Sequence, residues 1–326
     1  MGGSALKITP TRRYSKDEYD DISKEIQNIL PFETHIPLSF GDKDSFGDLD
    51  ILIRGSDYDK MYGSIPMKVY IEETFKPNEI YANSDVVSFD YKEFQIDFIK
   101  VKEHNWETSK IYFSYNDLGN FQGRIAYKMG FRYGNFGLRL VYLHPNGGRN
   151  FKMVVSKEPE EIFTFLGFDW KKYQKGFDSL ENIFNFVVES KYFNARIFDY
   201  DQLNHQNRTR NKKRVNYGKF LEHVKSFDDG YGYEDKDTYV KKAEDFFGIN
   251  IVEQIALWKK QIKRDNDASS RFNGNLIMKL FPELKGKTLG LAIMNFKAKI
   301  DDDFTDWIIS TDQETIWNTF KEVNKL

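Results

Sequence analysis

Three aspartates near the start of the chain have the type and spacing of a metal-binding site. Asp48 and Asp50 follow a polar, glycine-bounded loop (residues 41–47) and open an apolar run from Leu49 to Ile53. Because side chains alternate along a strand, both carboxylates point to one face. Two neighbouring carboxylates repel each other, whereas a hard cation such as Mg²⁺ binds them and keeps positions open for water and phosphate. The pattern predicts a metal site at the start of a strand.

Asp97 is the third candidate ligand. Residues 85–90 and 94–101 are alternating apolar runs around a short polar break, which is typical of a β-hairpin. Asp97 stands between Ile96 and Phe98, where an unpaired carboxylate is costly. If this strand neighbours the first one, all three carboxylates meet on one face of the sheet.

The acidic loop allows two other interpretations. An EF-hand requires an oxygen ligand at position five and a bidentate Glu at position twelve, but Phe46 and Ile53 stand there. A solvated acidic turn ahead of a core strand remains open. That interpretation leaves Asp97 without an explanation.

Residues 35–101 resemble the DNA polymerase β-type nucleotidyltransferase superfamily. The resemblance is carried by a Gly-containing loop, Asp-apolar-Asp at the start of a strand, and apolar-Asp-apolar on a later strand. Residues 45–53 are most similar to family X DNA polymerases, and the whole chain also resembles nucleotidyltransferase-like proteins of large phages. The resemblance implies that Asp48, Asp50 and Asp97 are catalytic and hold two Mg²⁺ ions, with Mn²⁺ as an alternative. It implies an NTP or dNTP, ATP among them, as the substrate.

The nucleotide-binding residues follow the family pattern less closely. The superfamily has Gly-Ser upstream of the carboxylates to grip the triphosphate, whereas this chain has residues 38–42, Leu-Ser-Phe-Gly-Asp. Either Ser39 or Ser45 is expected to take that role. A predicted helix over residues 117–130 adds two cations four residues apart on one face, for which a solvated basic stripe is the alternative. The expected nucleotide contacts are Ser39, Gly41, Lys43, Ser45, Gly47, Arg124 and Lys128.

A basic cluster lies in the second half of the chain. Five positive charges fall within residues 208–214, and Tyr217 follows. Such a cluster suits phosphate contacts, and the aromatic ring suits base stacking. The alternative is a solvated loop between helices. The expected nucleic-acid-binding residues are Arg208, Arg210, Lys212, Lys213 and Arg214.

The pattern of elements predicts an α+β protein of two domains. A capping box at Ser15 and Glu18 predicts a helix over residues 16–30. Residues 1–110 are expected to form a nucleotidyltransferase domain, a small mixed sheet with packed helices. Residues 111–326 are expected to form a mostly helical acceptor-binding domain with one hairpin near residues 137–155. Expected strands cover 36–40, 48–54, 85–90 and 94–101, and residues 67–75 are left open.

Composition narrows the possible partners. The formal net charge of −2 means that nucleic-acid affinity depends on local patches. The absence of Cys excludes thiolate metal sites and cysteine nucleophiles. No apolar run reaches the length of a membrane span, so no membrane partner is expected. A cytoplasmic location is expected, which is the host cytoplasm if the chain is phage-encoded. Oligomeric state is not predicted.

The expected function is metal-dependent transfer of a nucleoside monophosphate to an acceptor hydroxyl. The 3′ end of a nucleic acid is the favoured acceptor, and RNA is favoured over DNA because residues 272–293 faintly resemble the glycine-rich tail of tRNA CCA-adding enzymes. The alternatives are a family X-like DNA polymerase, although no helix-hairpin-helix signature precedes residue 41, and a non-catalytic binding protein. The base, the template requirement and the exact acceptor are not predicted.

Overall fold

The computed structural model describes residues 3–227, 229–300 and 303–326. The chain divides into two compact units, of which unit 1 comprises Met1–Tyr142 and Lys152–Ile249, and unit 2 comprises Leu143–Phe151 and Asn250–Leu326. The fold is α+β, as predicted. The division lies elsewhere than the predicted boundary at residue 110, because the helices up to Ile249 belong to the same unit as the N-terminal sheet.

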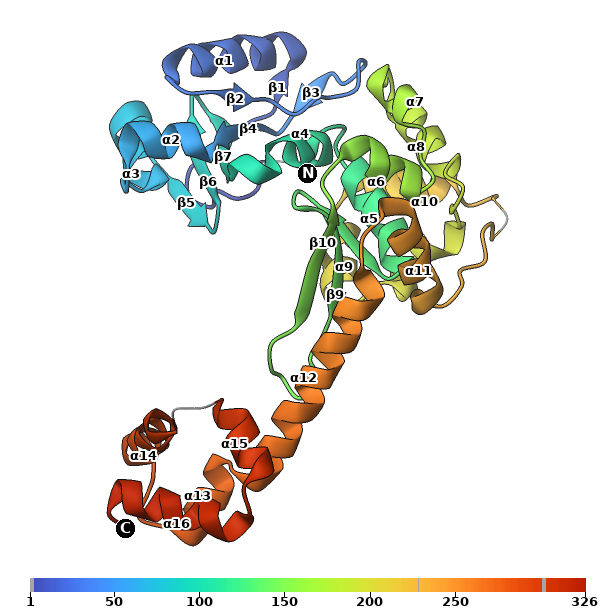
Figure 1. The fold of residues 1–326 in the computed structure, drawn as a ribbon. Helices are drawn as coiled ribbons and strands as arrows, with labels where there is room; N and C mark the ends of the chain where they lie inside the picture. Colours follow the sequence, from blue (N-terminus) through green and yellow to red (C-terminus); the bar gives the residue numbers. More distant parts are fainter. Residues whose placement is uncertain (1–2, 228, 301–302) are drawn as a thin grey trace. The chain divides into compact units, whose positions relative to one another are not determined.

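A five-stranded mixed sheet forms the first part of unit 1 (Figure 1). Its strand order is β2-β4-β7-β6-β5, with β4 and β7 parallel and the other pairs antiparallel. Parallel neighbours need a long crossover, and the chain between β4 and β7 includes α2 (Gly55–Tyr62) and α3 (Met67–Phe75), the segment that the sequence left open. The strands are β2 (Thr34–His35), β4 (Asp48–Arg54), β5 (Ile80–Asn83), β6 (Val86–Tyr91) and β7 (Phe94–Val101).

Helix α1 (Lys16–Ile29) confirms the predicted capping box. The Ser15 hydroxyl accepts from the Glu18 N–H at 3.3 Å, and the Ser15 N–H donates to the Glu18 carboxylate at 2.9 Å. The buried side of α1 joins α2 and α3 in one apolar core with alternate residues of β4 and β7. The core includes Ile22, Ile26, Leu49, Ile51, Ile53, Tyr58, Ile71, Phe94, Ile96 and Phe98.

The opposite face of the sheet is divided between apolar and acidic residues. At one end Leu52, Ile99 and Val101 pack against Trp106 at the start of α4 (Trp106–Phe113). At the other end of this face, the same alternation of side chains along β4 places Asp48 and Asp50. The short strands β1 (Tyr14–Ser15) and β3 (Ser45–Phe46) pair with each other just before β4.

Backbone hydrogen bonds join the loop before β4 to the helical part of unit 1. The Tyr115 N–H donates to the Leu38 carbonyl at 2.6 Å, and the Gly41 N–H donates to the Phe177 carbonyl at 3.0 Å. The Asp42 N–H donates to the carbonyl of the residue after Phe177 at 2.7 Å. These long-range contacts explain why the unit does not end near residue 110.

The rest of unit 1 combines a second sheet with short helices. The sheet has the order β10-β9-β8 and contains the predicted hairpin, whose strands are β9 and β10. Its strands are β8 (Phe131–Gly134), β9 (Gly137–Tyr142) and β10 (Phe151–Ser156). The helices are α5 (Leu118–Lys128), α6 (Pro159–Phe165), α7 (Trp170–Gln174), α8 (Leu180–Val188), α9 (His205–Lys212), α10 (Val215–His223) and α11 (Lys236–Phe247). The short 3₁₀ segments in the described residues are η1 (Glu103–Asn105), η2 (Ala195–Phe198) and η3 (Tyr200–Gln202).

Unit 2 is helical with an aromatic core. Phe272, Phe296 and Phe320 are buried there with Ile277. The hairpin tip belongs to this unit, where Trp258 donates from its indole N–H to the Arg149 carbonyl at 3.2 Å. The helices are α12 (Ile251–Arg271), α13 (Gly274–Leu280), α14 (Lys287–Lys299), α15 (Phe304–Ser310) and α16 (Gln313–Asn324).

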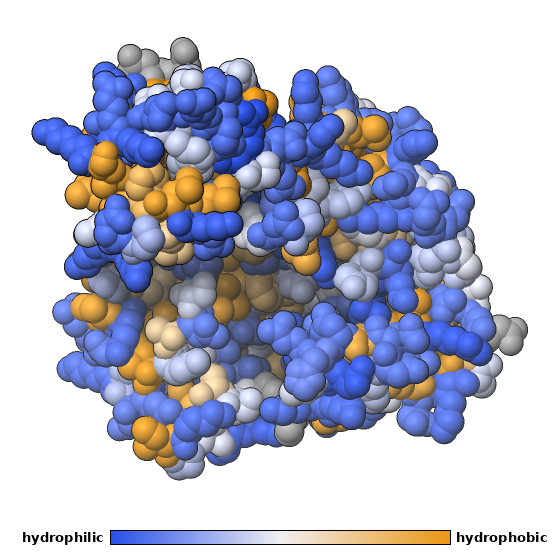
Figure 2. All heavy atoms as spheres, turned by 90° about the horizontal axis from the view of Figure 1, so that it is seen from below, coloured by the Kyte–Doolittle hydropathy of each residue, from blue (hydrophilic) through white to orange (hydrophobic). Residues whose placement is uncertain are grey.

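Hydrophilic residues cover most of the face seen in Figure 2, and the apolar residues on it form small groups. Within the described part of the chain, no helix combines the length and the apolar character that a membrane span requires.

Candidate active site

The three predicted aspartates lie on one face of the five-stranded sheet. Strands β4 and β7 pair in parallel with Asp50 directly opposite Asp97, and with Asp48 opposite Gln95. The residues that alternate with these aspartates point into the apolar core, so the carboxylates share the other face. Two segments about fifty residues apart in sequence therefore bring three acidic side chains together.

The proximity of these carboxylates perturbs their ionisation. Burial, followed by the charges of Asp48 and Asp97, raises the pKa of Asp50 well above its ordinary value. Burial and the charge of Asp48 raise the pKa of Asp97 to about 6. Each group resists ionisation because the others are nearby and water is partly excluded. A bound divalent cation would remove that repulsion, so the donor chemistry fits Mg²⁺.

Hydrogen bonds currently occupy several of the oxygens that a metal ion would need. The Gly3 N–H donates to Asp48 Oδ2 at 2.9 Å, and the Gln95 side-chain amide donates to both Asp97 oxygens at 2.9 and 3.1 Å. The N–H of Ala5 donates in turn to Gln95 Oε1 at 2.9 Å. With side chains in these positions, no three His, Cys, Asp or Glu residues of the described segments are gathered so that they could hold a metal ion.

The N-terminal segment fits this position only because residue 3 is glycine. Gly3 has a φ of +76°, and a Cβ built there would lie 2.0 Å from the Gly47 carbonyl oxygen. The segment is held further along by Glu79, whose carboxylate accepts three successive N–H groups, those of Lys7, Ile8 and Thr9. The chain thus runs over the acidic end of the sheet with its backbone against it.

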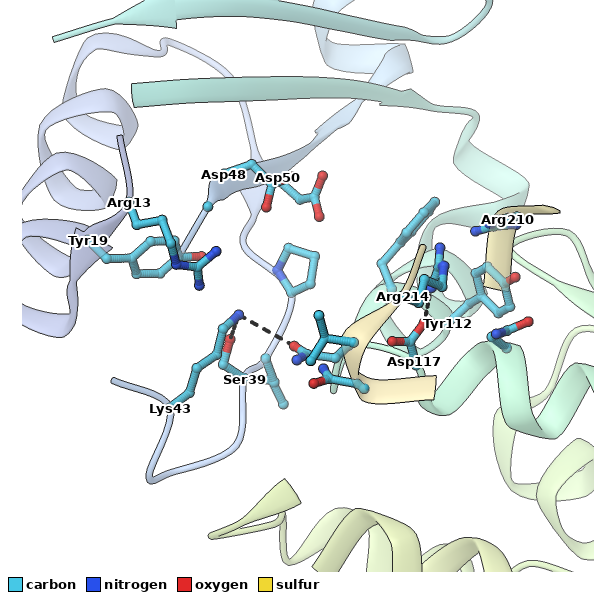
Figure 3. Close-up of a pocket in the computed structure, with 18 residues that line it drawn as sticks. Arg13, Tyr19, Ser39, Lys43, Asp48, Asp50, Tyr112, Asp117, Arg210 and Arg214 are labelled. Carbon is cyan, nitrogen blue, oxygen red and sulfur yellow. Dashed lines mark hydrogen bonds and ion pairs between the residues drawn. The ribbon is translucent and has the colours of Figure 1, made fainter. Parts of the chain in front are cut away.

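A pocket of about 580 Å³ opens beside Asp48 and Asp50 (Figure 3). Its walls come from β4, the loop before β4, α4, the start of α5 and the α9–α10 region. The charged and phenolic residues that line it are Arg13, Tyr19, Lys43, Asp48, Asp50, Tyr112, Asp117, Arg210 and Arg214. Acidic and basic groups from distant parts of the sequence therefore line the same pocket.

The structure separates the two serines that the sequence left as alternatives. Ser39 lines the pocket, and Lys43 Nζ donates to its hydroxyl at 3.5 Å. Ser45 instead accepts from Arg13 Nε at 2.6 Å. Lys43 also donates to the Asn116 side-chain oxygen at 3.4 Å. Burial lowers the pKa of Lys43, whereas Asp48 and Asp50 act in the opposite direction.

Among the two glycines expected to contact nucleotide, Gly47 lines the pocket. Gly41 is not one of the lining residues, because its backbone lies against residue 178, and a Cβ built on it would meet the Asp178 carbonyl oxygen at 3.2 Å.

Arg13 and Tyr19 also line the pocket and were not among the predicted site residues. Tyr19 belongs to the apolar stripe of α1, where its ring stacks on Phe46 with centroids 3.9 Å apart. Burial, then the charges of Asp50 and Asp48, raises its pKa. Local sequence gives no signal for either residue, because each reaches the pocket only through the packing of α1 and β1 on the sheet.

The expected triphosphate contact at Arg124 is corrected by the structure. Its guanidinium is buried and donates to the Ile197 carbonyl at 3.1 and 2.7 Å and to the Gln202 carbonyl at 3.3 Å. These bonds hold η2 and η3 against α5, so the side chain has a structural role. Lys128 is partly buried at the end of α5 and, like Arg124, is not one of the residues that line the pocket.

The basic cluster is mostly helical and only part of it faces the pocket. Arg210 and Arg214 line it, and Lys213 lines a neighbouring pocket of about 490 Å³. The expected nucleic-acid contact at Arg208 is corrected by the structure, because its guanidinium donates to the Tyr200 carbonyl at 2.9 Å and to the Leu203 carbonyl at 3.0 Å. Two further contacts complete the cluster: Arg214 pairs with Asp117, and Lys212 lies over the Tyr200 ring at 5.8 Å.

Comparison with known proteins finds no family model that matches the chain and no curated protein that matches its sequence.

Proposed function

We propose that unit 1 is a metal-dependent nucleotidyltransferase. The observation that carries the proposal is the parallel register of β4 and β7, which sets Asp50 beside Asp97 with Asp48 on the same face. The raised pKa of Asp97, about 6, reflects burial and the repulsion of Asp48, and a cation would relieve that repulsion. In this proposal Asp48, Asp50 and Asp97 hold the metal.

The reaction transfers a nucleoside monophosphate from an NTP to an acceptor hydroxyl. The acceptor hydroxyl releases its proton to solvent as its oxygen forms a bond to the α-phosphorus, the bond from that phosphorus to the bridging oxygen breaks, and pyrophosphate leaves. Bound Mg²⁺ supplies charge stabilisation for the entering and leaving oxygens. Lys43 and Ser39 lie on the pocket wall where a triphosphate would be bound. Arg210 and Arg214 also line the pocket, and in this proposal they contact a phosphate of the acceptor.

The test is label transfer with Mg²⁺ or Mn²⁺, each labelled NTP or dNTP, and short single-stranded RNA or DNA. Asp97→Ala is expected to abolish transfer, and Asp44→Ala, the same change at an exposed loop residue, is expected to retain it. Activity of Asp97→Ala at the wild-type level would refute the site. A preference for dNTP and DNA would favour the family X-like polymerase instead of the RNA-directed enzyme.

A non-catalytic binding protein is the second candidate, and one observation favours it. The Gly3 N–H occupies an oxygen of Asp48, and no described acidic or histidine group is arranged to hold a metal as it stands. Such a protein would bind nucleotide or nucleic acid without turnover. Nucleotide binding by equilibrium dialysis, together with no label transfer to any of these acceptors, would support this candidate.

A further inference from the structure

Two arginines face each other across the β8–β9 hairpin. Arg132 is the register partner of Arg139, so both side chains leave the same face of neighbouring strands. Like charges placed directly opposite destabilise a strand pair. Neither guanidinium makes a hydrogen bond or an ion pair with any residue that the structure describes, and Arg139 Nε is buried without a partner. The pair therefore lacks the anion that its position calls for.

Each guanidinium lies on a partly exposed aromatic ring. Arg132 Cζ is 4.6 Å from the Tyr127 ring centroid, and Arg139 Cζ is 4.8 Å from that of Phe136. Tyr127 and Phe136 keep 41% and 38% of their residue surface exposed, respectively. Cation–π contacts fix the guanidinium planes while leaving N–H groups for a ligand. The Tyr127 ring also carries the Arg124 guanidinium, with Cζ 5.2 Å from its centroid, so the exposed part of Phe136 is the platform on which a base can stack.

A third cation lies close to this pair. Lys236 Nζ is 3.4 Å from the Tyr142 ring centroid and donates to the Val141 carbonyl at 3.3 Å. Burial, then repulsion by Arg132, lowers the pKa of both Lys236 and Arg139. The Asp237 carboxylate counteracts the lowering of the Lys236 pKa, whereas no carboxylate counteracts the lowering of the Arg139 pKa. The local charge is positive.

We propose that this face of the hairpin binds a single-stranded nucleic acid. One phosphodiester lies between Arg132 and Arg139, and a base stacks on Phe136. A nucleic acid fits better than a carboxylate-bearing peptide because planar guanidinium groups and exposed rings recognise phosphate and base together. The proposal deepens the proposed function, since it rests on a nucleic acid being the acceptor. Tyr112 connects the two sites, because it lines the pocket beside Asp48 and Asp50 and is also close enough to Arg139 to affect its pKa.

The experiment measures binding without chemistry. Fluorescence anisotropy follows a labelled 12-nucleotide single-stranded RNA, and the DNA of the same sequence, in EDTA without nucleotide at several salt concentrations. The test variant is Arg132→Gln/Arg139→Gln. The control is Arg12→Gln/Arg196→Gln, which removes the same charge from unit 1 at two exposed arginines that are ion-paired with Glu18 and Asp229. Circular dichroism melting of both variants verifies that they fold.

The test variant is expected to lose about tenfold or more in affinity, and its log–log salt slope is expected to fall by about 0.7 for the phosphate contact removed. The control variant should bind as the wild type does. If the melting temperature of the test variant is unchanged or raised, the arginine pair serves binding and is not needed for the fold. Equal losses in the two variants, no loss in the test variant, or no binding by the wild type overturns the proposal.

The binding assay and the label-transfer assay test the two proposals independently. Arginine-dependent binding without label transfer would leave this site standing and reject the proposed enzyme. Label transfer that continues while Arg132→Gln/Arg139→Gln binds normally would reject this site and leave the enzyme standing.

Discussion

Replacing Asp97 by Asn is expected to stabilise the metal-free protein at alkaline pH. The folded-state pKa of Asp97 is about 6, above its ordinary value of 3.8, because burial and Asp48 disfavour the charged form. A raised carboxylate pKa means that the folded state binds the proton more tightly than the unfolded state, so stability falls as pH rises from about 4 through 6. Two pKa units correspond to about 3 kcal/mol. Asp97→Asn cannot ionise and escapes this cost.

The expected gain at pH 8 is about 2–3 kcal/mol in free energy of unfolding, which is roughly 5–10 °C in melting temperature for a domain of this size. At pH 4 the folded-state carboxyl is protonated, whereas the unfolded one, with its ordinary pKa of 3.8, is only about half ionised, so the difference should shrink to below about 1 kcal/mol. The amide of Asn keeps an oxygen that can accept from the Gln95 side chain, so the local packing is retained.

The assay is urea and thermal unfolding of both proteins in EDTA at pH 4 and pH 8, with Asp44→Asn as the control at an exposed position in the loop before β4. Adding Mg²⁺ at pH 8 should then stabilise the wild type by mass action and leave Asp97→Asn nearly unchanged. The reasoning is refuted if Asp97→Asn is no more stable than the wild type at pH 8, or if its advantage is the same at pH 4.

Three further predictions concern the pocket and the segment over it. Lys43→Gln is expected to raise the KM for the nucleoside triphosphate about tenfold in steady-state kinetics, since a charge-assisted contact to phosphate is lost; an unchanged KM would remove Lys43 from the site. Ser39→Ala is expected to raise the same KM while Ser45→Ala does not, because only Ser39 lines the pocket; the reverse order would contradict this assignment. Gly3→Ala is expected to tighten Mn²⁺ binding about fivefold, as measured by calorimetry. The added Cβ clashes with the Gly47 carbonyl, which breaks the hydrogen bond from residue 3 to Asp48, worth about 1 kcal/mol, and frees that carboxylate. Weaker Mn²⁺ binding would show that the N-terminal segment supports the site.

The acidic part of the site was predictable because its signals are local. Strand alternation fixes the face on which Asp48 and Asp50 lie, and an Asp in the middle of an apolar run marks Asp97 as unusual. The capping box at Ser15 likewise defines the start of α1 from four consecutive residues. What the sequence could not state is that β7 is the direct parallel neighbour of β4, since β5 and β6 intervene along the chain.

The basic part was less predictable because charge alone does not say where a side chain points. Arg124 and Arg210 look alike in sequence, but one is buried under 3₁₀ segments and the other lines the pocket. The α9 segment was expected as a basic cluster, and it is a helix that points only some of its cations at the pocket. Long-range backbone bonds such as Gly41 to Phe177 decide these positions, and no local pattern encodes them.

The arrangement of charges in the pocket supports the proposal that the acidic cluster binds a cation. Several cations lie near it, but each is engaged elsewhere: Arg13 with Ser45, Lys43 with neutral oxygens, and Arg214 with Asp117. In the described part of the chain, neither Asp50 nor its neighbours Asp48 and Asp97 form an ion pair with a lysine or arginine. The charge of Lys43 offsets the repulsion at Asp50 only in part, because the pKa of Asp50 stays well above its ordinary value. The divalent ion of the proposed function would relieve the rest.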